Sequence, residues 1–419
     1  MLDQTPLACK AGSLATTNPS GTMKLSIDHS HHFELLRILG HAYYGGSDVQ
    51  EVLQIAGRLT PGDDEGWYEA WNALAESLKV TADEAQEKGH LKSASQTYLR
   101  AAMYFMISDF YLHANTDDPR ILASGRASRA AFMAAIPGLD FEVARVEIPY
   151  EGAWLPGYVV KKKGTPAGKR PTLICHSGFD GNKEELVLFP GMAAAERGYT
   201  VVAFDGPGQG EVVRETRRAF RPDWDKVVSP VIDFALTRAD VDPSRIALLG
   251  ISLGGVLAPI AAAKDRRIRA LVANGGLYSF YDVVSARFPE AVPANRERFD
   301  QAVNAAIKTD TMSRWAINHG KLVFGVDNAF DYVNSTKPYV AADAAQVRAT
   351  TLVIDSEQEG FFEGQPQKLY DALTCEKTLM HFPSSEAVGE HCQAGAEAAG
   401  GRKIFDWLDE AMDVKSVKP

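Results

Sequence analysis

The chain has 419 residues, 45% of them hydrophobic and 23% charged, which is the balance of an ordinary water-soluble globular protein. A formal net charge of −10 argues against nucleic acid as a partner, because binding a phosphate backbone needs a basic surface. No apolar run approaches the roughly 20 residues of a membrane span, so we expect no membrane partner either.

The N-terminal third is predicted to be helical behind a polar tail. Residues 1–29 are assigned to a disordered tail, because residues 1–22 are rich in Ser, Thr, Gly and Ala and lack the apolar core of a secretory signal. Apolar side chains then recur at helical spacing, as at Trp67 and Trp71, with almost no strand signal. We assign residues 30–140 to a helical N-terminal cap domain.

The pattern changes at residue 141. Two alternating segments, 143–148 and 157–160, predict antiparallel strands at a sheet edge. Beyond them short apolar strands alternate with helices, which predicts a doubly wound, mostly parallel sheet. We assign residues 141–419 to one catalytic domain, with a helical insertion at about 280–345 that covers the site. The expected strands are 172–175, 199–204, 245–249, 268–273, 351–355 and 378–382, and the expected helices are 183–197, 223–237 and one starting near residue 393.

One motif on this predicted sheet points to chemistry. The segment Gly250-Ile251-Ser252-Leu253-Gly254 lies between the apolar run 246–249 and the helix-like stretch 256–263. A strand, a sharp glycine turn and a helix, with serine at the apex, form the nucleophile elbow of the α/β-hydrolase fold. The alternative is a tight strand–helix turn with a bystander serine.

A serine hydroxyl needs a histidine base, and the histidine needs a carboxylate that fixes its tautomer. In this fold the three follow in the order Ser, acid, His. His391 fits the base, because it lies between the last predicted strand and the last helix. We predict the acid to be Glu359, in the turn beyond strand 351–355, with Asp355 at the strand end as the alternative.

The oxyanion of the reaction needs two backbone N–H donors. We expect them to be Leu253, which follows the nucleophile, and Phe179, in the loop after the first parallel strand. Asp180 in the same loop is open between a structural role and contact with substrate. The helical face that carries Tyr104 and Tyr111 is expected to be mostly core, with these two tyrosines as candidates for lining the substrate pocket.

Other motifs receive plainer interpretations. Residues 205–210 are glycine-rich but lack the G-K-[ST] of a phosphate loop, so we expect a tight loop that shapes the site. The histidines in residues 28–32 are expected at a solvated helix start and not as metal ligands. The cysteines lack disulfide or metal spacing, which favours a reduced, cytoplasmic compartment, and Cys392 is expected as a packing residue. The four cysteines are Cys9, Cys175, Cys375 and Cys392.

Together these motifs resemble the α/β-hydrolases related to 2,6-dihydroxypseudooxynicotine hydrolase, a group that includes fungal polyketide-shortening hydrolases of naphthopyrone and melanin pathways. The resemblance covers about residues 33–412. It implies an active site between cap and core, hydrolysis of a carbon–carbon bond next to a ketone, no metal or organic cofactor, and a homodimer. The family triad is Ser, Asp and His, so Glu359 departs from it. The segments that carry the resemblance are 44–48, 65–71, 176–181, 204–211, 250–255 and 389–393.

Three hypotheses follow from these residues. The first is a serine-dependent hydrolase that cleaves a C–C bond next to a carbonyl in a polyketide-like or β-dicarbonyl small molecule of secondary metabolism. The second is an ester, thioester or lactone hydrolase, an acyltransferase or a cyclase that uses the same triad. The third is a ligand-binding member of the fold without catalysis, since function must be argued from the site and not from the fold.

Overall fold

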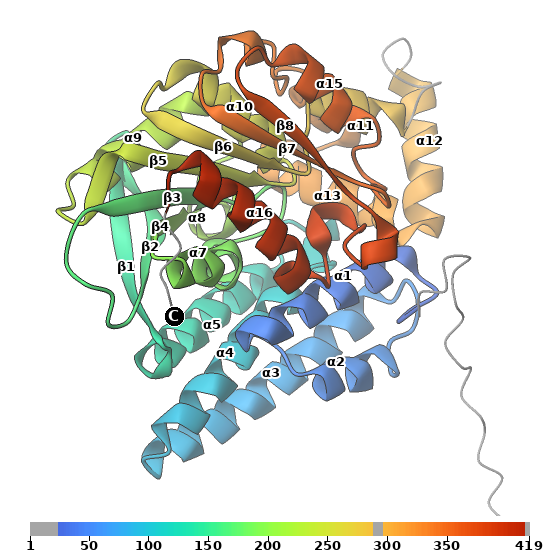
Figure 1. The fold of residues 1–419 in the computed structure, drawn as a ribbon. Coiled ribbons are helices and arrows are strands. Elements are labelled where there is room, and N and C mark those ends of the chain that lie inside the picture. The colour runs from blue at the N-terminus through green and yellow to red at the C-terminus, as the bar shows by residue number, and fades with distance from the viewer. Residues whose placement is uncertain (1–23, 288–295, 415–419) are drawn as a thin grey trace, which may run out of the picture.

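The computed structural model describes residues 24–287 and 296–414, so most of the predicted tail lies outside the described residues. Five helices come first and form a layer beside the sheet (Figure 1). Residues 28–32 are not the solvated helix start that we expected, because the His31 ring is buried against Trp67 and Tyr111. The five helices are α1 (His29–Gly40), α2 (Val49–Ala56), α3 (Asp64–Glu87), α4 (Leu91–Ser108) and α5 (Pro119–Ala135).

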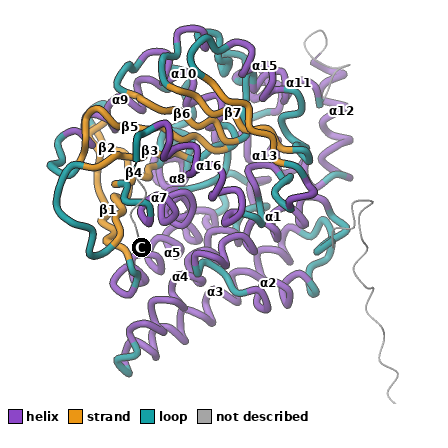
Figure 2. Tube along the Cα trace, viewed as in Figure 1, coloured by secondary structure: helices purple, strands orange, loops and turns teal. Residues whose placement is uncertain are grey.

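Eight strands form one sheet in the order β1-β2-β4-β3-β5-β6-β7-β8 (Figures 1 and 2). β1 pairs antiparallel with β2, β2 pairs antiparallel with β4, and every other neighbouring pair is parallel. This confirms the predicted α/β-hydrolase fold. The strands are β1 (Phe141–Tyr150), β2 (Ala153–Lys162), β3 (Arg170–His176), β4 (Thr200–Phe204), β5 (Val241–Ile251), β6 (Ile268–Asn274), β7 (Thr350–Ser356) and β8 (Lys377–Phe382).

Helices cover both faces of the sheet, with α9, α10 and α15 on one face and α7 and α16 on the other (Figure 1). The helix predicted over 183–197 is broken at Phe189, whose φ of −134° is not helical, and the proline that follows lacks an N–H for a helical hydrogen bond. These helices are α6 (Lys183–Leu186), α7 (Ala193–Glu196), α8 (Gly210–Thr216), α9 (Asp225–Leu236), α10 (Gly254–Lys264), α15 (Gln365–Ala372) and α16 (Glu397–Ala411).

Between β6 and β7 the described chain forms four further helices, where the sequence predicted a helical insertion. They are α11 (Phe280–Ala286), α12 (Arg296–Thr309), α13 (Thr311–Phe324) and α14 (Ala329–Ser335). α13 contacts α1 of the N-terminal layer, so two regions far apart in the sequence meet at the edge of the site. No helix of the described segments is both long and apolar enough to cross a bilayer.

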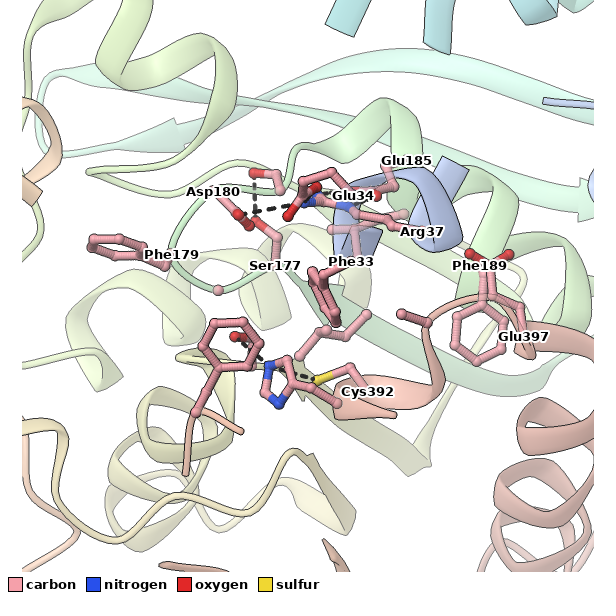
Figure 3. Close-up of a pocket in the computed structure, with 18 of the residues that line it drawn as sticks. Phe33, Glu34, Arg37, Ser177, Phe179, Asp180, Glu185, Phe189, Cys392 and Glu397 are labelled. Carbon is pink, nitrogen blue, oxygen red and sulfur yellow. Dashed lines mark hydrogen bonds and ion pairs between the residues drawn. The ribbon is translucent and has the colours of Figure 1, made fainter. Parts of the chain in front are cut away.

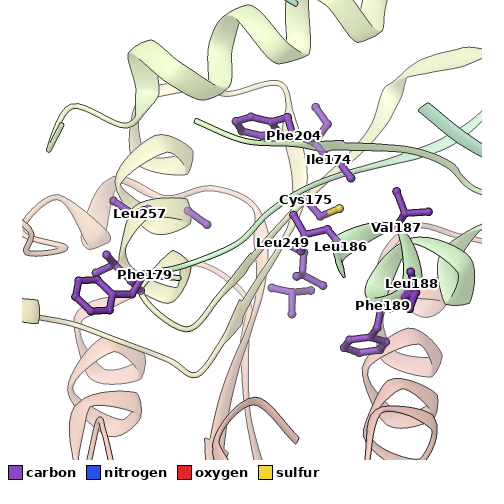
Figure 4. Close-up of a cluster of buried hydrophobic side chains, with 14 of the residues drawn as sticks. Ile174, Cys175, Phe179, Leu186, Val187, Leu188, Phe189, Phe204, Leu249 and Leu257 are labelled. Carbon is purple, nitrogen blue, oxygen red and sulfur yellow. The ribbon is translucent and has the colours of Figure 1, made fainter. Parts of the chain in front are cut away.

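The core lies under the central strands. Apolar side chains of β3, β4 and β5 are buried in the same hydrophobic cluster as Leu257 of α10 (Figure 4). Near-continuous apolar strands are what a parallel sheet covered on both faces requires. The buried strands give the loops at their carboxyl ends a rigid base, and those loops carry the residues of the site. The strand residues drawn in Figure 4 include Ile174, Cys175, Phe204 and Leu249.

Candidate active site

Ser252 and Leu253 lie between the end of β5 and the start of α10, and Ser252 has a left-handed φ of 60°. This conformation is uncommon for a residue with a side chain and is held by close packing of the turn. A Cβ on Gly250 would lie 2.2 Å from the carbonyl oxygen of Gly254, and one on Gly255 would lie 2.2 Å from that of Gly275. The glycines are therefore a steric requirement of the turn that exposes the serine.

His391 follows β8 and precedes α16, and its side chain is buried beside the elbow. Its Nε2 lies 3.0 Å from the Oγ of Ser252. The rings of Phe361 and Phe362 pack on the imidazole with centroid distances of 4.9 Å each, and Phe33 of α1 lies 6.2 Å away. The base is thus held in one orientation by aromatic side chains from both the core and the N-terminal layer.

Glu359 lies against the other ring nitrogen. Its Oε1 and Oε2 are 2.8 and 2.7 Å from Nδ1 of His391. The same Oε1 accepts the backbone N–H groups of Phe361 and Phe362, each at 3.1 Å. The carboxylate is therefore fixed by its own turn before it meets the histidine.

The register of two loops explains how a glutamate reaches this place. The backbone N–H of Gln358 donates to the carbonyl of Gly389 at 2.8 Å, and Gln358 forms a parallel bridge with Glu390. This bridge continues the β7–β8 pairing beyond the strand ends. Glu359 follows Gln358, and His391 follows Glu390. The two side chains therefore start side by side.

The electrostatics of the pair favour a charged histidine. Burial alone would lower the pKa of His391, but the adjacent Cys392 sulfur and the Glu359 carboxylate outweigh it and raise that pKa well above its usual value. Burial would likewise raise the pKa of Glu359, but His391 and the two backbone donors lower it overall. The site thus stabilises an imidazolium next to a carboxylate, which is the charge pattern that develops when a base takes a proton from serine.

Asp355, the alternative acid, lies elsewhere. Its Oδ2 is 2.8 Å from Nδ1 of His381 on the neighbouring strand β8, where the two residues are direct partners in the sheet. Both side chains are substantially exposed. The structure therefore brings Glu359, and not Asp355, to His391.

The two predicted oxyanion donors lie on segments that touch. A Cβ on Gly178 would come within 2.6 Å of the Leu253 nitrogen and 2.9 Å of the Ser252 Cβ. Only glycine therefore allows the loop that carries Phe179 to approach the elbow this closely. Leu253 is fully buried at the start of α10.

A cavity of about 140 Å³ opens over these residues, and both Ser252 and His391 line it. Aromatic side chains line much of the cavity, and Glu34, Arg37, Asp180 and Glu185 form a charged group in one part of its wall (Figure 3). A smaller apolar cavity of about 60 Å³ adjoins it and shares several of the aromatic walls. An elongated, largely apolar molecule with polar substituents fits this arrangement. The aromatic residues that line the main cavity are Phe33, Phe179, Phe189, Phe280, Trp315, Phe361 and Phe362.

The charged wall is built around Arg37 of α1. Its guanidinium contacts Glu185 at 2.6 Å, Glu34 at 3.2 Å and Asp180 at 3.3 Å (Figure 3). Burial and the neighbouring carboxylates raise the pKa of Glu34 to about 8, even though Arg37 acts in the opposite direction. Asp180, which the sequence left open between a structural role and contact with substrate, lines the cavity with its carboxylate anchored to Arg37.

Tyr104 and Tyr111 do not line this cavity. The Tyr104 hydroxyl donates to Glu51 at 2.8 Å and accepts the Asp48 N–H, while the Tyr111 hydroxyl bonds to Ser30 at 2.8 Å. Both are buried in the packing of the N-terminal helices. Their hydroxyls are used within the fold, so we do not carry their predicted substrate role further.

Sequence reasoning missed two parts of the site. The charged wall comes from α1, and no motif marked Glu34 or Arg37 as site residues. Cys392, expected as a packing residue, lines the cavity with its Sγ 3.3 Å from His391 Nε2 and 3.4 Å from the carbonyl of Asn274. Its position next to His391 in the sequence was the available signal. The described parts of the chain contain no group of three or more His, Cys, Asp or Glu side chains placed to hold a metal ion.

Comparison with known proteins places the chain. Residues 166–404 match the alpha/beta hydrolase family. The chain belongs to this family. Among characterised relatives, it is 35% identical over 415 residues to the hydrolase acrC of Aspergillus aculeatus, covering 92% of this chain and 97% of the relative. It is 34% identical over 406 residues to the 20-hydroxy-prefusarin hydrolase FUS2 of Gibberella moniliformis, with the same coverage.

Solved structures of this family share the fold over nearly the whole chain. The 2,6-dihydroxy-pseudo-oxynicotine hydrolase superposes with a TM-score of 0.70 at 21% identity, covering 91% of this chain and 97% of that one. AbyA5 superposes with a TM-score of 0.60 at 17% identity, covering 90% of this chain and 94% of its own. The similarity to the first shows a shared fold with the protein whose group the sequence motifs resemble.

Proposed function

We propose that this α/β-hydrolase uses Ser252 as nucleophile, His391 as general base and Glu359 as the acid that orients the histidine. The observation that carries this proposal is the unbroken contact from Ser252 Oγ through both nitrogens of His391 to the Glu359 carboxylate, at 3.0 and 2.7 Å, with Ser252 and His391 on the wall of one cavity. Nucleophile, base and orienting carboxylate in hydrogen-bond reach are the arrangement that activates a serine.

The mechanism follows from these positions. His391 Nε2 takes the Ser252 proton as Oγ attacks a substrate carbonyl, and the imidazolium is stabilised by Glu359. We propose that the N–H groups of Phe179 and Leu253 hold the oxyanion, each contributing about 10²–10³ in rate. Collapse of the tetrahedral intermediate breaks the bond to the leaving group, which takes the proton from His391. Water, activated by the neutral His391, then releases the acyl group from Ser252.

For the substrate, we propose a polyketide-like or β-dicarbonyl small molecule of secondary metabolism, cleaved at a C–C bond next to a carbonyl. In that case the leaving group departs as an enolate, which a second carbonyl stabilises. The sequence motifs support this class, and relatives named as hydrolases, including a 20-hydroxy-prefusarin hydrolase, support a small-molecule substrate. The aromatic and charged walls of the cavity suit such a molecule. Hydrolysis of an ester, thioester or lactone, or acyl transfer, by the same residues is the alternative.

The test separates the nucleophile from the bond that is cleaved. A fluorophosphonate probe should label the wild-type protein at Ser252, as read by peptide mass, and Ser252→Ala should lose both the label and all turnover. Parallel incubation with a 1,3-diketone series and with matched esters, followed by product analysis, distinguishes C–C from C–O scission. A folded wild-type protein that the probe leaves unlabelled would favour the non-catalytic hypothesis.

A further inference from the structure

The loop that carries Phe179 accepts hydrogen bonds from side chains on two sides. On one side, the side-chain amide of Gln209 donates to the carbonyl of Ser177 at 2.6 Å and to that of Gly178 at 3.3 Å, and its Oε1 accepts the N–H of Gly206. The Gly178 carbonyl and the Phe179 N–H belong to one planar trans peptide, so they point in opposite directions. Holding the carbonyl therefore aims the N–H away from Gln209. The glycine-rich segment 205–210 thus acts on the site through its glutamine.

On the other side, a buried histidine pair holds the next peptide. His319 of α13 donates from Nε2 to the Phe179 carbonyl at 2.8 Å. Its Nδ1 lies 2.8 Å from Nδ1 of His113, which follows α4, and Nε2 of His113 lies 3.2 Å from Asp109. Arg214 of α8 contacts the same Asp109 oxygen at 2.5 Å. These contacts therefore join the N-terminal helices, the insertion and the core at the oxyanion loop.

The hydrogen bonds from Asp109 through His113 and His319 to Phe179, which we call the relay, need one more hydrogen than two neutral imidazoles supply. The Asp109–His113, His113–His319 and His319–Phe179 hydrogen bonds need one hydrogen each. Two neutral imidazoles supply two hydrogens, so the third belongs to the Asp109–His113 contact. The same Asp109 oxygen accepts from Arg214 at 2.5 Å and from His113 at 3.2 Å, so the hydrogen of that contact lies on His113. Burial lowers the pKa of His319, in agreement with a neutral ring that accepts at Nδ1 and donates at Nε2.

Charged groups from several elements face this proton. Arg214 and Arg37 act against an additional positive charge at the pair. Asp109 lies in direct contact with His113, Asp118 at the start of α5 interacts with it, and Asp180 lines the same small cavity as both histidines. His113, His319 and Asp109 are all buried. Losing any one of these buried hydrogen bonds is therefore costly.

We propose that Asp109, His113 and His319 form a protonated relay that fixes Phe179 in the geometry of an oxyanion donor, so that these residues position the catalytic loop without touching substrate. This inference rests on the proposed function, because Phe179 matters only if Ser252 forms a tetrahedral oxyanion. Loss of the shared proton breaks one of the three hydrogen bonds and loosens the Phe179 peptide. Activity at Ser252 should therefore fall at alkaline pH for a reason independent of His391, which must be neutral to act.

The experiment measures the second-order rate of Ser252 labelling by a fluorophosphonate probe across neutral and alkaline pH, in the full chain. Displacement of fluoride from phosphorus places negative charge in the same oxyanion site, so no natural substrate is needed. His319→Gln keeps an N–H donor but cannot carry the relay. We expect it to slow labelling about tenfold, less than the loss of a whole donor, and to abolish the alkaline fall. His319→Ala should be slower still.

His381→Gln is the matched control, since His381 also contacts a carboxylate at 2.8 Å but lies exposed at the surface. It should label at the wild-type rate with the wild-type pH dependence. A merely structural role for His319 would lower the unfolding temperature or the labelled fraction while leaving the rate constant and its alkaline fall unchanged, and that result overturns the proposal. Wild-type protein that labels without any alkaline fall also overturns it. Wild-type protein that fails to label at all overturns the proposed function first.

Discussion

Two histidine–carboxylate pairs lie at and just beyond the ends of the neighbouring strands β7 and β8. Their contact distances are nearly equal, but their exposure to solvent differs greatly. Glu359 and His391 meet at 2.7 Å with side chains only 4% and 7% exposed. Asp355 and His381 meet at 2.8 Å with side chains 33% and 53% exposed. The two acids are four positions apart in the sequence, and either one satisfies the chain order of a hydrolase triad.

The surroundings of the two pairs, and not their contacts, distinguish the proposed catalytic pair from the surface pair. Glu359 accepts two backbone N–H groups, and the far nitrogen of His391 meets Ser252 at the cavity wall. Asp355 and His381 lie opposite each other in the sheet, facing water. In water an ion pair gains little, whereas a buried carboxylate beside an imidazolium strongly shifts the proton balance. A short histidine–carboxylate distance is therefore weak evidence for a triad on its own.

The largest expected effect comes from Glu359→Gln. The amide keeps the size of the side chain but cannot stabilise an imidazolium, so we expect turnover to fall by about 10⁴ with the fold intact. Single-turnover acylation with an activated ester, together with an unfolding curve, measures both quantities. If the loss stays within a few-fold, Glu359 is not the orienting acid.

Glu359→Asp tests the length of the arm. The family pattern has aspartate in the triad, but here the Gln358–Glu390 bridge sets the backbone for the longer side chain. Removing one methylene draws the carboxylate back from His391 by about 1 Å, a displacement that can cost about 10² in rate. The same acylation assay should place this variant between wild type and Glu359→Gln. Activity equal to wild type would mean that the loop adjusts freely.

Much of the candidate site could be predicted from the sequence, because its signals lie in short stretches of the chain. The glycines around Ser252 predicted the elbow. The chain order and the strand pattern predicted His391 and the turn of Glu359. Each of these signals depends on neighbours within a few residues. The docking of α1 was not available. Whether Arg37 faces the cavity depends on how a helix from the first forty residues packs against α13 and α16. The hydroxyl of Tyr104 was likewise indistinguishable from a substrate contact until its partner Glu51 was seen.

A smaller effect is expected on the pH dependence of the buried pair. Burial lowers the pKa of His391, but Cys392 and Glu359 together raise it by more than burial lowers it. The neutral base therefore predominates only above an elevated pKa. Cys392→Ala removes one of the raising groups, which should move the acidic limb of the rate–pH profile to lower pH. The plateau rate should change by only a few-fold. An acidic limb that moves to higher pH, or not at all, would mean that the Cys392 side chain does not stabilise the charged form of His391.

Asp355→Asn should do the least. Exposed ion pairs contribute about 0–1 kcal/mol, so we expect the unfolding free energy to fall by no more than that, less at high salt, and turnover to stay within about twofold of wild type. Paired acylation assays on Asp355→Asn and Glu359→Gln decide between the two carboxylates, since the same chemical change is made four residues apart. A loss of about 10⁴ at Asp355 with little loss at Glu359 would reverse the assignment. It would require the turn after β7 to rearrange so that Asp355 leaves its partner His381 in the sheet and enters the cavity. The backbone N–H groups that bind Glu359 oppose such a rearrangement.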